Sequence, residues 1–198
     1  MVKRQFEQER GFTMIELMLV VAIGMILMGM AMGGVPGLVK TSRADGGLAN
    51  ALSGLRAARE LAISSRRNVR VTFGTNTIMN TKVEYCAAPC AGGPATTLMR
   101  TTTLEGRAEF RQPPPAEITV DTGDGFGKAA TDGINLGTLV PAMFTTDGSF
   151  INSNGDVLNG TIFIGVPGET LSTRAISIFG ATGAMHLWRW NGRAWVEM

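Results

Sequence analysis

Hydrophobic and polar positions divide the chain into three stretches with different patterns. A nearly uninterrupted apolar run extends from Gly11 to Val39 and carries a single charged side chain, Glu16. Apolar residues then recur every three or four positions, which is typical of an amphipathic helix, at Leu48, Ala51, Leu52, Leu55, Ala58, Ala62 and Ile63. From Asn68 onward, alternation and turn residues predict strands. The pattern therefore predicts an α+β fold in which one long helix, bent near Pro36, runs from about Phe12 to Ser65 against an antiparallel sheet.

The carboxyl-terminal part is expected to be rich in short strands. Val69, Val71 and Phe73 share one face of the first strand. Further strands are predicted at residues 78–85, 142–145, 161–166, 174–179, 184–190 and 194–196, with loops at residues 87–94 and 123–137 and a stiff Pro113–Pro115 connector. The last three strands suit a meander, with one turn at Gly180–Gly183 and a type I′ hairpin at Asn191-Gly192.

The apolar run is long enough to cross a bilayer. Its 23 residues from Leu17 to Val39 would form a helix of roughly 35 Å, against about 30 Å of hydrocarbon. Basic residues Lys3, Arg4 and Arg10 precede it, so the amino terminus is expected to remain cytoplasmic. A charge in such a run costs about 2.5–3.5 kcal/mol on insertion scales, so Glu16 should have a function and a partner.

The order of these parts differs from that of a secretory signal peptide. The charged segment and the small residue Gly11 come before the apolar run, so cleavage there would retain the helix. The block Gly11-Phe12-Thr13-Met14-Ile15-Glu16-Leu17 resembles the signal of type IV pilins and type II secretion pseudopilins. The resemblance implies that prepilin peptidase cleaves after Gly11 and N-methylates Phe12, and that Glu16 meets the Phe12 amine of a neighbouring subunit. The alternatives are an ordinary anchor, or a Glu16 that is merely solvated at headgroup depth.

The remainder of the chain narrows this resemblance. Stretches within residues 48–72, the Phe144–Ser149 block, the strand from Gly160, and residues 174–190 resemble the GspH/FimT minor pilins. The resemblance implies a leader at residues 1–11, a transmembrane and filament-core helix at 12–39, an amphipathic helix at 40–66 and a periplasmic β-rich domain at 67–198. The fold it implies is pilin-like.

The expected function is structural and not enzymatic. The chain has one histidine and lacks a nucleophile elbow or a phosphate-binding loop. The resemblance implies a minor pseudopilin of a type II secretion pseudopilus, anchored in the inner membrane with its carboxyl-terminal domain in the periplasm. The alternative is a FimT-like minor pilin of a type IV pilus that serves pilus assembly or DNA uptake. Expected partners are prepilin peptidase, other pilins or pseudopilins and the inner membrane, with no cofactor, metal or small-molecule substrate.

Two cysteines, Cys86 and Cys90, flank Ala-Ala-Pro. In an oxidising compartment they are expected to form a disulfide that closes a small loop, with free thiols as the alternative. Methionines 18, 25, 28, 30 and 32 are interpreted as apolar packing, because their spacing gives no single clean helical stripe. Asp121, Asp124, Asp132 and Asp147 lie among glycines, which is ordinary turn chemistry and not an EF-hand spacing.

Near the carboxyl end, aromatic residues alternate with arginines at Trp188, Arg189, Trp190, Arg193 and Trp195. Such a cluster can stack on bases and contact phosphates, which makes Arg189 and Arg193 the residues to test for DNA contact. Some FimT-like proteins bind DNA through a Gly-Arg-x-Arg element in this region, but this chain has Gly183-Ala184-Met185-His186. The net charge of +2 also gives no reason to expect bulk nucleic-acid binding. Packing on the sheet or a subunit contact is the favoured interpretation.

Overall fold

The computed structural model describes residues 12–83, 96–113, 132–136, 141–169 and 171–198. The chain divides into two units, residues 1–39 and residues 40–198, and each is described by itself. The helix α1 (Met14–Ser65) begins in the first unit and ends in the second. The predicted bend near Pro36 concerns the placement of one unit relative to the other, so it stays a prediction.

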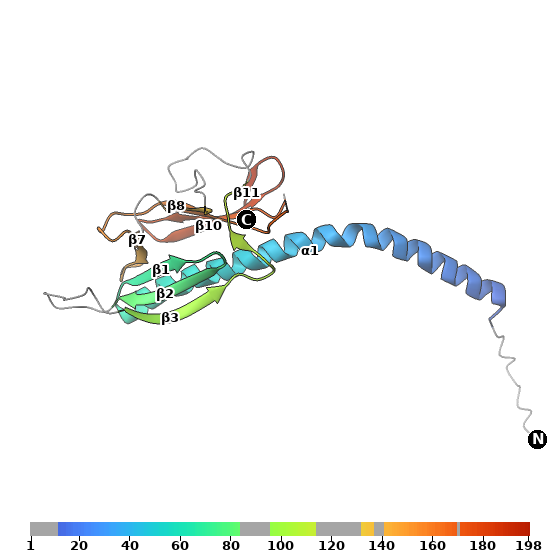
Figure 1. Ribbon diagram of the computed structural model, residues 1–198, viewed down its shortest axis with the longest axis horizontal. Coiled ribbons are helices and arrows are strands. Elements are labelled where there is room, and N and C mark those ends of the chain that lie inside the picture. The colour runs from blue at the N-terminus through green and yellow to red at the C-terminus, as the bar shows by residue number, and fades with distance from the viewer. Residues whose placement is uncertain (1–11, 84–95, 114–131, 137–140, 170) are drawn as a thin grey trace, which may run out of the picture. The chain divides into compact units, whose positions relative to one another are not determined.

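Within the second unit, the strands form two antiparallel sheets, and not the single sheet that the sequence predicts (Figure 1). The first sheet has the order β3-β2-β1-β6-β7, with β1 at Val69–Phe73, β2 at Thr77–Val83, β3 at Thr96–Thr103, β6 at Ala142–Phe144 and β7 at Phe150–Ile151. The second has the order β11-β10-β9-β8-β4, with β4 at Glu109–Phe110, β8 at Gly160–Gly165, β9 at Arg174–Phe179, β10 at Ala184–Trp190 and β11 at Trp195–Glu197. The short strand β5 (Ile134–Asn135) also pairs with β8.

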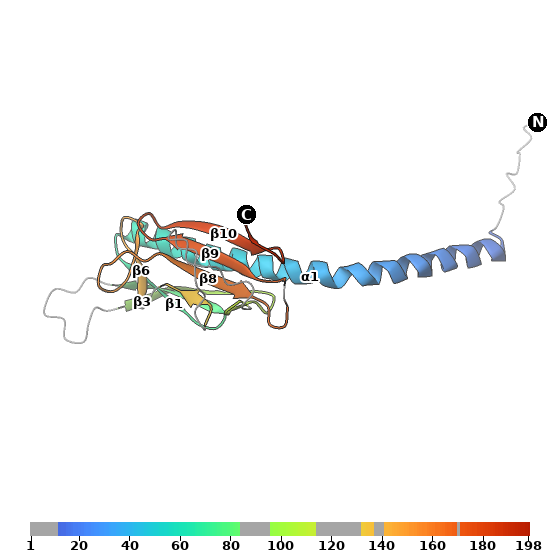
Figure 2. The same cartoon turned by 90° about the horizontal axis from the view of Figure 1, so that it is seen from above.

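The carboxyl-terminal half of α1 packs against both sheets (Figures 1 and 2). A stripe of small and apolar residues makes this packing possible. The residues of the stripe are fully or almost fully buried, namely Ala44, Gly47, Leu48, Ala51, Leu55, Ala58 and Ala62. A Cβ on Gly47 would lie 2.5 Å from Ala108 Cβ, and one on Gly54 would lie 3.2 Å from Thr102 Oγ1 of β3. Because these glycines lack side chains, the helix backbone can approach the sheets closely. Ile63, which the periodicity placed on this stripe, is instead 45% exposed.

The side chains between the helix and the sheets form one hydrophobic core. Val69, Val71 and Ile78 enter it from the first sheet, and Ile162, Ile164, Ile176 and Ile178 from the second. The rings of Phe73 and Phe110 meet edge to face at 5.5 Å and join the two sheets. The whole of β8 is buried, because its other face is covered as well. This architecture is α+β and compatible with a pilin-like fold.

Most predicted strands are confirmed, and the differences involve short or polar strands. The strands at 174–179 and 184–190 have the expected bounds, and the meander through β9, β10 and β11 is present. Four strands were missed: β3, a run of threonines, and the two-residue strands β4, β5 and β7. The hairpin after β10 is not a two-residue type I′ turn. It is a four-residue loop, in which Asn191 Oδ1 accepts hydrogen bonds from the backbone N–H groups of Arg193 and Ala194.

Candidate assembly site

Glu16 lies in the first turn of α1 and takes part in the helix cap. The backbone N–H of Glu16 donates to Thr13 Oγ1 at 3.4 Å and to the Thr13 carbonyl at 3.1 Å. Thr13 and Glu16 therefore occupy the first and fourth positions of a capping box, in which a glutamate also suits the positive end of the helix. Phe12, the expected mature terminus, is 79% exposed. The cap thus uses the backbone N–H of Glu16, while the charge of its carboxylate suits the amino-terminal end of the helix, in addition to the expected contact between subunits.

Apolar side chains are exposed on every face of the first part of α1. From Phe12 to Met30, each described residue is exposed, including Ile15, Leu19, Ile23 and Leu27. A helix that is apolar all round requires an apolar environment on all sides. Among the residues that the structure describes, no helix reaches the length and hydropathy of a membrane span.

Four methionines of this segment lie on one side of the helix. At about 100° per residue, Met14, Met18, Met25 and Met28 fall within about 80° of one another around the helix. Met30 lies on the opposite side, together with Glu16. Because Met30 lies apart from Met18, Met25 and Met28, the five methionines singled out in the sequence share no single stripe.

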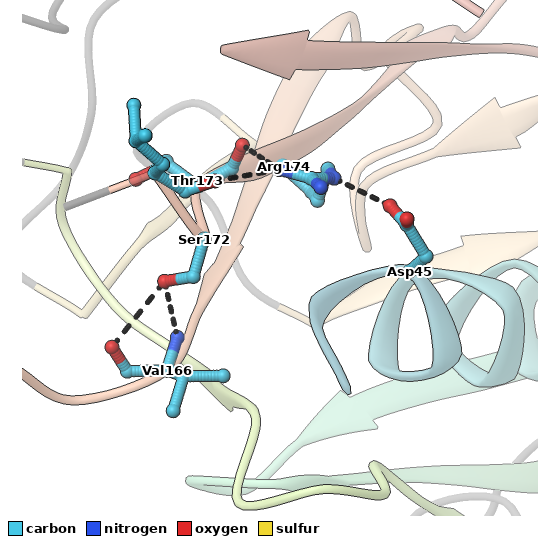
Figure 3. A network of polar contacts seen from close by, with 6 residues as sticks. Asp45, Val166, Ser172, Thr173 and Arg174 are labelled. Atoms are coloured by element: carbon cyan, nitrogen blue, oxygen red, sulfur yellow. Dashed lines mark hydrogen bonds and ion pairs between the residues drawn. The ribbon is translucent and has the colours of Figure 1, made fainter. Parts of the chain in front are cut away.

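A buried arginine attaches the second part of α1 to the second sheet (Figure 3). Arg174, at the start of β9, is only 1% exposed, and its Nε donates to Asp45 Oδ1 of α1 at 2.7 Å. Its Nη1 donates to the carbonyls of Leu171 and Thr173 at 3.1 and 3.0 Å. A buried guanidinium is costly unless it is paired and hydrogen-bonded, and these contacts meet that requirement. The pair links α1 to the start of β9.

A second arginine of α1 joins two turns that are far apart in the sequence. Arg59 Nε donates to the Gly148 carbonyl at 3.2 Å, and Nη2 donates to the Thr182 carbonyl at 3.0 Å. The two turns also touch, since a Cβ on Gly183 would lie 2.1 Å from Gly148 O. The Phe144–Ser149 and Gly180–Gly183 segments, two of the segments in the GspH/FimT resemblance, thus meet at one helix residue.

The turn at Asp147 is held by its own hydrogen bonds. Asp147 Oδ1 accepts hydrogen bonds from Thr145 Oγ1, from Ser149 Oγ at 2.8 Å and from the Ser149 backbone N–H at 3.1 Å. The Thr145 hydroxyl, followed by the Ser149 hydroxyl and backbone, lowers the pKa of Asp147 to about 2. Asp147 is therefore a turn residue, and Asp132 has the same role, since its Oδ1 accepts from the Ile134 N–H at 3.1 Å.

Trp188 and Trp190 lie on one face of β10, and Arg189 lies on the other. The Trp188 indole donates to Ser177 Oγ at 2.9 Å, and the Trp195 ring packs 5.7 Å from Phe163 and 5.6 Å from Trp190. Arg189 alternates with these residues and is exposed on the other face, opposite Arg174 of β9. Arg193 is exposed in the loop after β10. The strand therefore does not present Trp188 and Arg189 together on one surface.

Several expected site residues lie outside the described residues, namely Gly11, Cys86, Cys90, Asp121 and Asp124. Within the described ranges, no group of three or more potential ligands could hold a metal ion. The residues that the sequence reasoning missed are Arg174 with Asp45, and Arg59. A charged residue at the start of a predicted strand was the available signal for Arg174, whereas the partners of Arg59 are backbone carbonyls, which no sequence pattern identifies.

The family described as "Prokaryotic N-terminal methylation motif" matches residues 8–32, which include Gly11, Phe12 and Glu16. This match supports a type IV pilin-like or pseudopilin protein, a structural protein that prepilin peptidase processes and that assembles with other pilins. Neither the comparison with curated proteins nor the comparison with solved structures finds a match.

Proposed function

We propose that this protein is a minor pseudopilin of the GspH type, a structural subunit of a type II secretion pseudopilus. The observation that carries the proposal is the methylation motif directly at the start of α1. Two further features support it. The first part of α1 exposes apolar side chains on all sides, and the second part is buried against the sheets of the carboxyl-terminal unit.

The two parts of the helix suggest two successive environments for the subunit. Before assembly, the apolar segment is held in the inner membrane, with the β-rich unit in the periplasm. In the filament, the same segment packs among the helices of neighbouring subunits. Glu16 then pairs with the methylated amine of Phe12 in a neighbour, because a carboxylate in an apolar bundle is costly unless it is paired. Cys86 and Cys90 form a disulfide in the periplasm.

Processing is the first test of this proposal. Co-expression of the full chain with a prepilin peptidase should remove residues 1–11 and leave N-methylated Phe12, which intact-mass and amino-terminal peptide measurements would detect. Replacing Gly11 with leucine should leave the full-length chain uncleaved. Cleavage elsewhere, or an unmodified Phe12 beside an active peptidase, would contradict the proposal.

Glu16 requires a test that separates assembly from helix capping. A glutamine retains the hydrogen-bonding capacity of a capping box, whereas an alanine does not. We therefore expect Glu16→Gln and Glu16→Ala to insert normally and to impair incorporation into the filament to a similar extent. If Glu16→Gln incorporates normally and only Glu16→Ala fails, Glu16 serves as a cap and the contact between subunits is wrong.

The secretion system is distinguished from the pilus by phenotype. Deletion of the chain should reduce export through the type II system and leave pilus-dependent DNA uptake unchanged. The opposite result would favour the FimT-like alternative. In that case, salt-sensitive DNA binding that is lost on replacing Arg189 and Arg193 would support direct DNA contact.

A further inference from the structure

A groove lies between the carboxyl-terminal end of α1 and the beginning of β10. Its volume is about 470 Å³. Arg56, Glu60 and Ile63 are among the helix residues that line it, and Gly183–Met185 form the opposite wall. Both walls belong to the carboxyl-terminal unit, so the groove is a feature of one folded body.

The walls of this groove are held in place. Arg59 spans from the helix to the carbonyls of Gly148 and Thr182. Gly183 has a positive φ of 63° and leaves no space for a side chain beside Gly148 O. A partner would therefore meet a preformed surface, which lowers the entropic cost of binding.

The β10 wall offers an open backbone edge. β9 pairs with β10 along Ala184–Arg189 and β11 pairs with Trp188–Trp190, and among the described residues the backbone bond nearest to Met185 on the β11 side is that from Met198 N–H to the Leu187 carbonyl. In an antiparallel sheet, the backbone groups of alternate residues point to the same side. Since the Leu187 carbonyl points toward β11, the N–H and carbonyl of Met185 point to that side too. There, the described residues supply no strand to pair with them.

The side chains around this edge combine an apolar surface with positive charge. Ile63 is 45% exposed and Met185 is half-buried, so the groove has apolar contacts to offer. Arg56 is exposed at the groove beside Arg59, whereas Glu60 is the only carboxylate among the described residues that line it. An open strand edge next to apolar and cationic side chains fits an extended peptide that carries a carboxylate.

We propose that this groove binds an extended, acidic segment of a neighbouring filament subunit, which adds as a strand to β10 at Met185 and places a carboxylate near Arg56. The inference rests on the proposed function, because that function supplies the neighbouring subunit. It adds a contact between the β-rich units to the contact that the helices make.

Site-specific cross-linking in assembled filaments tests this contact. A photo-reactive amino acid is introduced at Ile63 of the full chain, and, as a control, at Leu171, which is also exposed but precedes β9. We expect Ile63, and not Leu171, to cross-link to a segment of another subunit that contains Asp or Glu. Hydrogen exchange of the same filaments should show slower exchange at the Met185 amide than in the unassembled protein, because pairing protects this amide.

A charge reversal provides the matched control. Arg56→Glu should reduce the yield of the Ile63 cross-link by about fivefold, because it replaces attraction with repulsion. Arg193→Glu makes the same change at an exposed arginine in the loop after β10 and should leave the yield unchanged. The inference is wrong if the two variants behave alike, if the segment captured carries no carboxylate, if Ile63 captures only lipid, or if Met185 exchange does not slow.

The two proposals fail in different ways. If the chain is processed and incorporated into filaments but the groove gives none of these signals, the docking inference fails and the proposed function stands. If Phe12 is neither exposed by cleavage nor methylated, the proposed function fails first, and the groove loses its proposed partner.

Discussion

The two parts of α1 differ in where their partners are. From Phe12 to Met30, large apolar side chains are exposed on all faces, and the described residues supply no cover for them. From Ala44 to Ala62, a narrow stripe dominated by alanine, glycine and leucine is buried against two sheets of the same chain. Small residues allow close backbone approach to a partner that is already folded beside the helix. Large exposed residues indicate partners outside the chain. One continuous helix is thus specified for two different environments.

The largest effect is expected from breaking the attachment of the second part to its sheet. Asp45→Ala should lower the free energy of unfolding by about 2 kcal/mol, because it leaves the buried Arg174 without its carboxylate. Denaturant unfolding of the full chain in detergent micelles, followed by tryptophan fluorescence, measures this loss. Glu60→Ala, at an exposed position of the same helix, should change stability by no more than about 0.5 kcal/mol. Equal effects of the two variants would show that the Asp45–Arg174 pair does not fix the helix.

A matched glycine pair tests the comparison directly. Gly47→Ala should destabilise the carboxyl-terminal unit by about 1–2 kcal/mol, because its Cβ would clash with Ala108 and outweigh the gain in helix propensity. Gly24→Ala, in the first part, has no atom within 4 Å of the added Cβ and should leave the same unfolding transition unchanged. If both substitutions shift the transition, the first part of α1 also packs against the folded unit.

A smaller, stabilising effect is expected at the carboxyl-terminal end of α1. Arg66 has a positive φ of 51°, and the N–H groups of Arg66 and Arg67 donate to the carbonyls of Ile63 and Ala62. This is the helix-terminating arrangement in which glycine is preferred. Arg66→Gly should therefore raise the free energy of unfolding by about 0.5–1 kcal/mol. Arg56→Gly, within the helix, should instead lower it by about 1 kcal/mol.

The smallest effect concerns the turn that Arg59 contacts. The pKa of Asp147 is lowered from 3.8 to about 2 in the folded chain, so the ionised carboxylate favours folding. Its contribution is complete above about pH 4 and is lost as the pH falls through 2. In acid titrations of stability, wild type should thus lose more than Asp147→Asn between pH 4 and pH 2. Parallel curves for the two proteins would show that the turn hydrogen bonds do not depend on the charge.

Much of the fold could be predicted because its signals are local. The stripe from Leu48 to Ala62 has helical spacing, and the strands at 174–179 and 184–190 have clear apolar runs and turn residues between them. The division of the strands into two sheets could not be predicted, since pairing between distant strands leaves no local mark. The threonine-rich β3 and the two-residue strands exist because their neighbours supply hydrogen bonds.

The candidate assembly site also has a part that the sequence could identify and a part that it could not. Gly11, Phe12 and Glu16 form a motif of adjacent residues, so the sequence alone could identify it, and the family match includes these positions. The attachment of Asp45 to Arg174 joins residues 129 positions apart. The contact of Arg59 with Thr182 spans 123 positions. Only folding brings these groups together.

The sequence by itself determined the elements whose cause is local, namely the methylation motif, the apolar first part of α1, its amphipathic second part and the meander. The tertiary structure alone decided which faces are buried, which arginine becomes a buried partner of α1, and where β10 has an edge that no described strand covers. The physical reason is the distance along the sequence over which each kind of interaction acts. Helix periodicity and turn chemistry act over a few residues, whereas burial, ion pairing and strand pairing depend on what distant segments place nearby.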